Sequence, residues 1–401
     1  MVAPVSPPSI DAADAHVIRR AVHRQADAYV AFLSRLVRAE SPSTDPDAQI
    51  GVQRPLARAL RDLGYTLTIL PGTRTGGCLY ARPSHTPPAT PRQLLLGHSD
   101  TVWPHGTLAR MPVRHTGDRL AGPGVFDMKA GLTSIVFALR TLRRLGHTPA
   151  ATPLVLVTSD EEIGSQESQH HIERLARCSD RVFVLEPALG LEGRIKTARK
   201  GTGEYGVRLF PAAAATPAPS APPTASASSA MELARLVQRL HALNAPERGT
   251  TVNVGTLDGQ PHSDGSVGRL AVDVRVQTTA DADRIDGVLR SLTASSSAFR
   301  LAVDGEMERE PLERTPRNQA LWAQARRLGT LLDLDLRDGR AGGGSDGNFT
   351  SLHTATLDGL GAVGDGAHAD HEFIDIPRTL DRCALLALLL LAPLNAASVE
   401  G

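Results

Sequence analysis

The sequence predicts an α/β protein in which a smaller domain is inserted into a larger one. At 401 residues the chain is longer than a single hydrophobic core usually supports. Apolar strand-like runs alternate with helical periodicity in the first half of the chain, as they do in α/β domains. From about residue 200 the order changes to strand, helix, strand, strand, helix, strand, and helical and glycine-rich signals return after Glu313.

The larger domain is predicted from its apolar runs. Helical periodicity extends from about Ile10 to Arg38, and PLARALRDLG indicates a second, short helix. The runs QLLLGH (93–98), PLVLVTS (153–159) and RVFVLEP (181–187) indicate inner strands covered on both faces, and MKAGLTSIVFALRTLRRLG indicates an amphipathic helix. Polar residues follow each of these strands, at the edge where open α/β sheets bind ligands.

The smaller domain is predicted over residues 200–312, and the larger one over 1–199 and 313–401. The six segments EYGVRLF, SAMELARLVQRLHALN, TTVNVGTL, RLAVDVRVQT, DADRIDGVLRSLTA and FRLAVDG form a ferredoxin-like β-α-β-β-α-β sequence of roughly 110 residues, enough for a domain. A further helix is expected in NQALWAQARRLGTLL. The apolar run ALLALLLLAPL is about half a membrane span long, so a buried C-terminal helix is expected.

Composition excludes several classes of partner. Lys plus Arg and Asp plus Glu both number 43, so neither nucleic acid nor an anionic membrane is an expected ligand. The first twenty residues hold no apolar run of secretory length, which favours a cytoplasmic protein. Cys78, Cys178 and Cys383 show no C-x-x-C spacing, and all three are expected to be small core residues in a reducing compartment.

Candidate metal ligands follow the predicted strands. His98 and Asp100 lie two apart, so they share a face of the strand end, although a structural histidine is the alternative. Asp127 stands before the amphipathic helix, where a helix N-cap is the alternative. Further carboxylates come from Asp160, Glu161 and Glu162, with a solvated turn as the alternative, and from Glu186. His368, His371 and Glu372 add two imidazoles and a carboxylate, where an isolated His could be a surface residue. Together they fit a zinc site with nitrogen and oxygen ligands.

These segments resemble a known family. GHSDTV, GPGVFDMKAG, TSDEEIGS, VLEPA, RKG, GGGSDGNF and GAHADHEF match, in order, the cocatalytic dinuclear-zinc hydrolases. That family includes glutamate carboxypeptidase of the carboxypeptidase G type, aminoacylase, acetylornithine deacetylase and succinyl-diaminopimelate desuccinylase. The resemblance covers about residues 20–395 and is strongest to the glutamate-carboxypeptidase-like branch. It implies a mixed, mostly parallel sheet with flanking helices, and an inserted lid and dimerisation domain.

The resemblance also implies roles for particular residues. Asp127 would bridge two zinc ions, for which cobalt or manganese could substitute. His98 and Glu186 would complete one metal site, and Glu162 and His368 the other. Asp100 would hold the imidazole of His98, and Glu161 would be the general base. The expected reaction is hydrolysis of an amide, N-acyl or peptide bond next to a free carboxylate, in a small N-acyl amino acid or short peptide, by a homodimer.

Substrate recognition departs from the family pattern. Arg275 matches an arginine suited to anchoring a carboxylate, with a structural salt bridge as the alternative, and the backbone around Gly343 would cradle the same group. The oxyanion-stabilising His of the family would fall within residues 215–223, which contain none. Gln260 follows Gly259 where relatives pair glycines, and Ser263 or Asp264 stands where relatives carry an Asn. His262 could substitute for the missing His or be a surface residue.

Three hypotheses therefore remain open. Loss of one oxyanion donor typically lowers the rate roughly a hundred- to a thousandfold. A zinc amidohydrolase or carboxypeptidase with altered recognition accounts for the retained ligands. A metal-binding homologue with weak or lost hydrolysis accounts for the missing His and Asn. A biosynthetic protein with an altered lid accounts for the retained ligands as well as for the missing residues.

Overall fold

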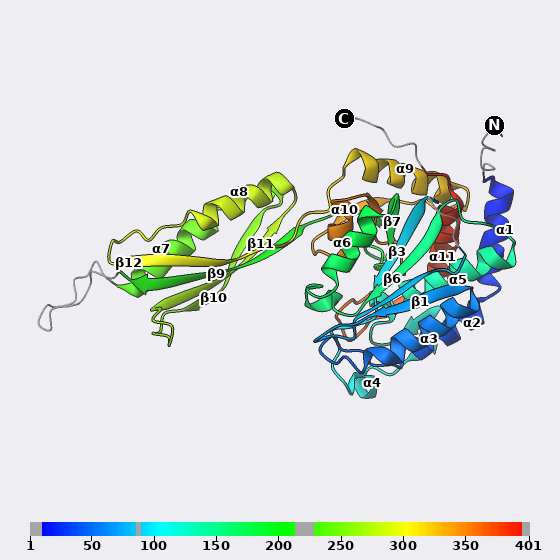
Figure 1. Cartoon of the computed structure of the whole chain (residues 1–401), viewed down its shortest axis with the longest axis horizontal. Coiled ribbons are helices and arrows are strands. Elements are labelled where there is room, and N and C mark those ends of the chain that lie inside the picture. The colour runs from blue at the N-terminus through cyan, green and yellow to red at the C-terminus, as the bar shows by residue number, and fades with distance from the viewer. Residues whose placement is uncertain (1–9, 86–89, 213–227, 395–401) are drawn as a thin grey trace, which may run out of the picture. The chain divides into compact units, whose positions relative to one another are not determined.

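The computed structural model describes residues 10–85, 90–212 and 228–394, and places them in two compact units (Figure 1). The larger unit comprises Met1–Ala198, Arg314–Ala341 and Ser345–Gly401, and the smaller unit comprises Arg199–Glu313 and Gly342–Gly344. Residues 215–223, where the resemblance would place the oxyanion-stabilising His of the family, fall within residues 213–227, which lie outside the described residues.

A six-stranded mixed sheet, in the order β1-β2-β6-β3-β7-β14, forms the centre of the larger unit. β3 runs parallel to β6 and β7, and β14 runs parallel to β7. β2 is antiparallel to both β1 and β6. The predicted α/β class with a mixed, mostly parallel sheet is confirmed. The strands are β1 (Tyr65–Leu70), β2 (Cys78–Pro83), β3 (Arg92–His98), β6 (Thr152–Thr158), β7 (Arg181–Val184) and β14 (Ala355–Leu357).

Helices cover both faces of this sheet because residues alternate along each strand. Leu95, Val155 and Phe183 face one core, which α1, α2, α3, α5, α9 and α11 complete. Leu94, Leu156 and Val184 face the opposite core, with α6 and α10. The helices are α1 (Ala12–His23), α2 (Ala26–Val37), α3 (Gln49–Asp62), α4 (Thr107–Arg110), α5 (Ala130–Arg144), α6 (Gln169–Arg177), α9 (Pro316–Thr330), α10 (Asp346–Ser351) and α11 (Ile376–Leu391).

Short strands and turns complete the larger unit. β15, β16, β5 and β4 form one small sheet, and β13 pairs with β8. The bounds are β4 (Arg114–Thr116), β5 (Arg119–Ala121), β8 (Ile195–Arg199), β13 (Asp338–Ala341), β15 (Gly364–Asp365), β16 (Phe373–Asp375), an irregular helical turn (Val125–Lys129) and a 3-10 turn η2 (Glu161–Ile163).

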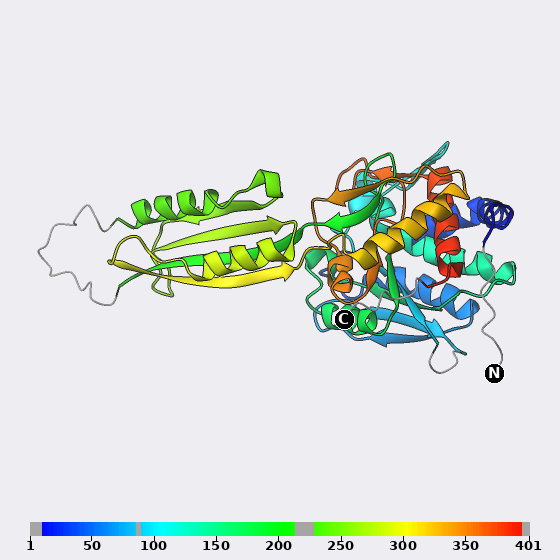
Figure 2. The ribbon, with the colours of Figure 1, turned by 90° about the horizontal axis from the view of Figure 1, so that it is seen from above.

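The smaller unit is a four-stranded antiparallel sheet in the order β10-β11-β9-β12. Tyr205, Val207 and Leu209 alternate along β9 and face α7 and α8, which cover one side of the sheet (Figures 1 and 2). Ser228 and Thr278 cap these two helices through their side chains. The elements are β9 (Gly201–Pro211), α7 (Ser229–His241), η4 (Pro246–Arg248), β10 (Thr251–Asp258), β11 (Gly268–Val276), α8 (Thr279–Arg290) and β12 (Phe299–Arg309).

The structure differs from the sequence predictions in three places. The helix expected over residues 10–38 is two helices, because the backbone of Gln25 leaves helical geometry with φ −102° and ψ 12°. The hairpin β1–β2 was not predicted, since its alternating polar residues give no long apolar run. Cys178 is exposed beside the end of α6, so its prediction as a core residue is wrong, while Cys78 and Cys383 are buried. No helix among the described residues is long and apolar enough to cross a membrane.

Candidate metal centre

Five predicted ligands come from segments at one edge of the central sheet. His98 ends β3, Glu162 lies in the 3-10 turn after β6, and Glu186 follows β7. Asp127 lies in the irregular turn before α5, and His368 follows β15. The carboxyl ends of parallel strands meet at the same edge, which explains why residues from β3, β6 and β7 converge there.

The side chains make a continuous set of contacts. His98 Nε2 lies 3.3 Å from Asp127 Oδ1 and 3.4 Å from Glu186 Oε1. His368 Nε2 lies 3.4 Å from Asp127 Oδ2 and 3.0 Å from Glu162 Oε2. Asp127 therefore faces both imidazoles, one through each oxygen. The structure brings together the five residues that the sequence singled out as metal ligands.

Glu372 holds the backbone around Asp127 in this position. Glu372 Oε1 accepts hydrogen bonds from the N–H groups of Phe126 (2.9 Å) and Asp127 (3.0 Å), and Glu372 Oε2 accepts from Gly124 (2.8 Å). Trp103 Nε1 donates to the same carboxylate at 3.0 Å. Gly124 adopts the left-handed backbone, with φ 72°, that glycine tolerates best. The helix-cap alternative for Asp127 is wrong, because Lys129 occupies the N-cap position of α5 and makes no side-chain cap bond.

Asp100 contacts the other side of the His98 ring. Its Oδ1 lies 3.3 Å from His98 Nδ1, and its Oδ2 accepts a 2.7 Å hydrogen bond from Ser43 Oγ. The N–H of Glu162 also donates to Asp100 Oδ2, at 3.2 Å. Asp100 is completely buried, so its carboxylate joins the imidazole on β3 to the turn that carries Glu162.

Burial and opposite charges perturb the imidazoles and carboxylates strongly. Burial acts to lower the pKa of His98, but the nearby Asp100, Asp127 and Glu186 hold it well above its usual value. Contacts with Asp127 and Glu162 raise the pKa of His368 to about 11. Burial raises the pKa of Glu162, whereas the two imidazoles outweigh burial at Asp127 and keep its pKa far below normal. The carboxylates thus concentrate negative charge around the two imidazoles, an environment that favours a nearby cation.

The donor set fits divalent cations. His98 Nε2, Asp127 Oδ1 and Glu162 Oε1 are buried and lack a hydrogen-bond partner among the described residues. Ligand atoms of His98, Asp127 and Glu162 lie within 4.8 Å of one another, as do those of His98, Glu161 and Glu186. Buried polar atoms without partners are costly, and a cation coordinated by imidazole nitrogen and carboxylate oxygen would satisfy them.

His368 has an unusual backbone conformation. Its φ is 62°, in the left-handed region that non-glycine residues seldom occupy, and its side chain is 52% exposed. Such conformations cost on the order of 1–3 kcal/mol and occur most often at functional sites. His368 is thus an exposed member of the cluster, whereas its partners Asp127 and Glu162 are only 14% and 6% exposed.

Other residues from the predicted motifs lie elsewhere. Asp160 accepts backbone hydrogen bonds from Glu167 (2.9 Å) and Ser168 (3.1 Å) and so stabilises the turn after η2. His371 is exposed. In the smaller unit His262 Nε2 lies 3.4 Å from Asp258 Oδ2, and the His262 side chain is 19% exposed.

The two predicted substrate residues also belong to the smaller unit. Arg275 is half exposed, its Nε lies 3.2 Å from Asp273 Oδ1, and its Nη1 lies 3.5 Å from the carbonyl of Gly342. The carbonyl of Gly343 accepts a 3.1 Å hydrogen bond from Arg199. The salt bridge considered as an alternative for Arg275 is therefore present.

Two residues at the site make contacts that the sequence did not predict. Lys196 Nζ lies 3.7 Å from Glu186 Oε2, and it comes from β8, whose mixed sequence IKTAR gives no strand signal. Glu372 was noticed only as one of several acidic residues. Its spacing, four residues after His368, was the available signal, but its contact with the Asp127 turn depends on the tertiary fold.

Imidazoles and carboxylates gathered at the carboxyl ends of an α/β sheet are typical of metal-dependent hydrolases. Comparison with known proteins agrees. The model of peptidase family M20/M25/M40 matches residues 94–392, so the chain belongs to this family of metallopeptidases and related amidohydrolases.

Individual relatives share this likeness over different parts of the chain. Carboxypeptidase G2 of Pseudomonas sp. (strain RS-16) is 25% identical over 403 residues, covering 93% of this chain and 92% of that protein. Succinyl-diaminopimelate desuccinylase of Gluconacetobacter diazotrophicus is 33% identical over 133 residues, covering 32% and 33% respectively. A solved dinuclear metal binding peptidase of the M20 family from Bacillus subtilis has a TM-score of 0.65 at 11% identity, covering 92% and 98%.

Proposed function

We propose that this enzyme uses two zinc ions to hydrolyse an amide or peptide bond next to a free carboxylate. The observation that carries the proposal is the convergence of His98, Asp127, Glu162, Glu186 and His368. Three of their buried ligand atoms have no hydrogen-bond partner in the part of the chain that the structure describes. The match to carboxypeptidase G2 across most of both chains supports a carboxypeptidase or N-acyl-amino-acid amidohydrolase.

Asp127 would bridge the two cations, since its two oxygens face different imidazoles. His98 and Glu186 would complete one site, and Glu162 and His368 the other. Bound cations would supply Lewis-acid polarisation of the scissile carbonyl and would acidify a water molecule. Cobalt or manganese, which accept similar ligands, could replace zinc in this donor set.

Glu161 is the proposed general base. Its ligand oxygen lies within 4.8 Å of those of His98 and Glu186, and the neighbouring Glu162 is a proposed ligand. The carboxylate would take a proton from water and then deliver it to the departing amine. Asp100 would orient His98 by accepting from Nδ1, which leaves Nε2 directed at a cation.

Substrate recognition rests on the smaller unit in this proposal. Arg275 and the backbone at Gly343 would bind the free carboxylate of an N-acyl amino acid or short peptide. Arg275 has a planar guanidinium suited to bidentate contact, although its exposed pair with Asp273 would have to compete. The smaller unit would also serve as a lid and as the surface of a homodimer.

Glu161→Gln tests the proposed chemistry. Activity on N-acyl amino acids and glutamyl peptides is expected to fall about a hundred- to ten-thousandfold, because the amide cannot carry the proton. Zinc content, measured by elemental analysis, should remain at about two ions per chain. Glu247→Gln, at an exposed position in η4, removes the same charge as a control and should leave both quantities unchanged.

Two results would contradict the proposal. Wild-type activity in Glu161→Gln would exclude Glu161 as the base. Failure of the wild-type protein to bind zinc or cobalt stoichiometrically would exclude the metal centre. Stoichiometric zinc with no turnover of any substrate would instead favour the metal-binding homologue that the absence of His from residues 215–223 suggests.

A further inference from the structure

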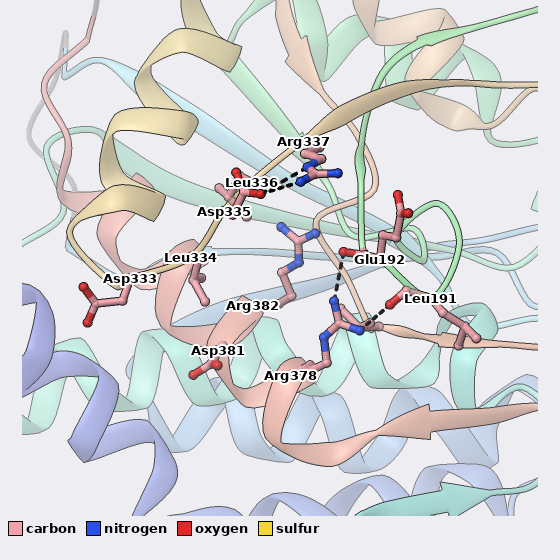
Figure 3. A pocket seen from close by; sticks show the side chains of 12 residues that line it. Leu191, Glu192, Asp333, Leu334, Asp335, Leu336, Arg337, Arg378, Asp381 and Arg382 are labelled. Carbon is pink, nitrogen blue, oxygen red and sulfur yellow. Dashed lines mark hydrogen bonds and ion pairs between the residues drawn. The ribbon is translucent and has the colours of Figure 1, made fainter.

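A cavity of about 540 Å³ lies in the larger unit, and its lining includes none of the proposed metal ligands. Four segments surround it: the loop before β8, the loop between α9 and β13, Val363 just before β15, and the first turns of α11. Figure 3 shows the cavity from close by. Leu334, Leu336 and Val363 contribute apolar surface. Arg337, Arg378 and Arg382 contribute three guanidinium groups.

Arg382 is the unusual member of this lining. The residue is only 3% exposed, and its Nη1 atom is buried without a hydrogen-bond partner. Throughout the described part of the chain, no hydrogen bond or ion pair to Arg382 is present. Burial lowers the pKa of Arg382 to about 10, so the side chain still carries its charge at neutral pH. An unpaired buried charge is strongly unfavourable unless a counter-ion reaches it.

The acidic residues around the cavity are paired with other groups. Asp381 pairs with Arg19 (2.7 Å) and His23 (2.7 Å), and Figure 3 shows it directed away from Arg382. Asp335 pairs with Arg337 at 2.9 Å. Glu192 lies 3.4 Å from Arg194, and Asp333 lies 3.5 Å from His16. These last three carboxylates are largely exposed, so solvent screens them from Arg382.

Arg378 adds a second guanidinium without a carboxylate partner among the described residues. It donates to the carbonyl of Glu192 at 2.9 Å and to the carbonyl of Leu191, which fixes it at the cavity wall. Backbone carbonyls do not neutralise its charge. Two arginines from successive turns of α11 therefore direct positive charge towards the same cavity, as the close-up shows.

We propose that this cavity is a binding site for a small oxyanion, with Arg382 as its principal ligand and Arg378 as its second. A carboxylate, phosphate or sulfate group offers paired oxygens that match the planar guanidinium. The apolar side chains would accommodate a short aliphatic part of a ligand that carries this group. The site is separate from the metal centre, so its occupant need not be the substrate.

Sulfate titration of the zinc-loaded protein tests the proposal, with chloride used to keep ionic strength constant. Calorimetry should detect binding, and the thermal midpoint should rise with sulfate concentration because the anion binds the folded state. In Arg382→Met the affinity should fall about tenfold or more, as expected when a charged hydrogen-bond partner is lost. Arg177→Met, at an exposed ion pair, removes the same charge and should bind as the wild type does.

The same variants separate a ligand site from a structural arginine. Without sulfate, Arg382→Met should unfold at a midpoint equal to or above that of the wild type, since the substitution removes an unpaired buried charge. A midpoint well below that of the wild type would mean that protein contacts hold Arg382, and would overturn the proposal. Equal sulfate affinity in the two proteins would also overturn it.

A crystal of the wild type soaked in selenate gives a result that does not depend on folding of the variant. Anomalous density beside Arg382 would support the site, and density confined to the metal centre or absent altogether would overturn it. Parallel titrations with acetate and inorganic phosphate identify the class of ligand. Preference for acetate indicates a carboxylate, and preference for phosphate indicates a tetrahedral oxyanion.

Discussion

Single residues in this protein act through partners that lie far away in the sequence. Asp100 shows this clearly, because it contacts Ser43 on one side, His98 beside it and the backbone of Glu162 on the other. The spacing of His98 and Asp100 predicted that they share a face, and the resemblance implied their contact. The bond from Ser43 could not be predicted, since nothing in the sequence brings that turn next to β3.

Asp100→Asn is expected to weaken zinc binding about ten- to a hundredfold, the usual effect of disturbing a residue that orients a metal-bound imidazole. The amide can present an N–H towards His98 and so no longer selects its orientation. Competition with a chromophoric zinc chelator measures the affinity. Asp27→Asn, at an exposed position of α2, is the matched control. Unchanged zinc affinity in Asp100→Asn would show that Asp100 does not orient a metal ligand.

One contact between elements depends on Glu167, a carboxylate in the loop after η2. Glu167 accepts hydrogen bonds from the hydroxyl of Thr75 (2.7 Å), the N–H of Arg74 (2.9 Å) and both the hydroxyl and the N–H of Thr73. These contacts join the loop between β1 and β2 to the segment before α6. Burial opposes ionisation, but these donors outweigh it and lower the pKa of Glu167 from 4.5 to about 2.

This shift predicts how stability depends on pH. Because the folded-state pKa is depressed, the contribution of Glu167 is fully present above about pH 4.5 and is lost as the pH falls towards 2. Glu167→Gln should lower the free energy of unfolding by about 1–3 kcal/mol at pH 6, and the difference should shrink at pH 3. Urea unfolding at both values measures it. A difference that stays constant or grows on acidification would contradict the assignment.

For the whole molecule, the two compact units imply separate folding. The smaller unit has its own core, which includes Leu236, Val272 and Ile285. Its chain ends lie together, because Arg199 and Leu312 exchange backbone hydrogen bonds of 3.0 and 3.2 Å. The domain boundaries expected at residues 200 and 312 can therefore be tested directly by excision.

A fragment spanning residues 199–313 should fold alone and unfold cooperatively, as followed by circular dichroism during heating. Val272→Asp places a charge in the core of this unit and should abolish the transition. A wild-type fragment without a cooperative transition would show that the smaller unit requires the rest of the chain.

The proposed homodimer predicts a second property of the whole molecule. Met231 on α7 is 53% exposed, and Leu257 on the edge strand β10 is 54% exposed. Covering both would remove apolar surface and protect an unpaired strand edge. Light scattering should give a mass twice the 42.5 kDa of one chain, and Met231→Asp should reduce the mass to that of a single chain. Leu352→Asp, on the larger unit, is the control. A monomeric wild type would refute the dimer.

The sequence by itself determined the α/β class and the types and order of the residues at the metal centre. This was possible because the apolar runs that form strands are local patterns. The residues that follow parallel strands lie at the same edge of the sheet. Only the tertiary structure decided how these residues are supported. Glu372 reaches the turn of Asp127 across 245 residues of chain, and Arg382 becomes a buried, unpaired charge only where α11 meets two distant loops. Such contacts follow from packing, which no local pattern encodes.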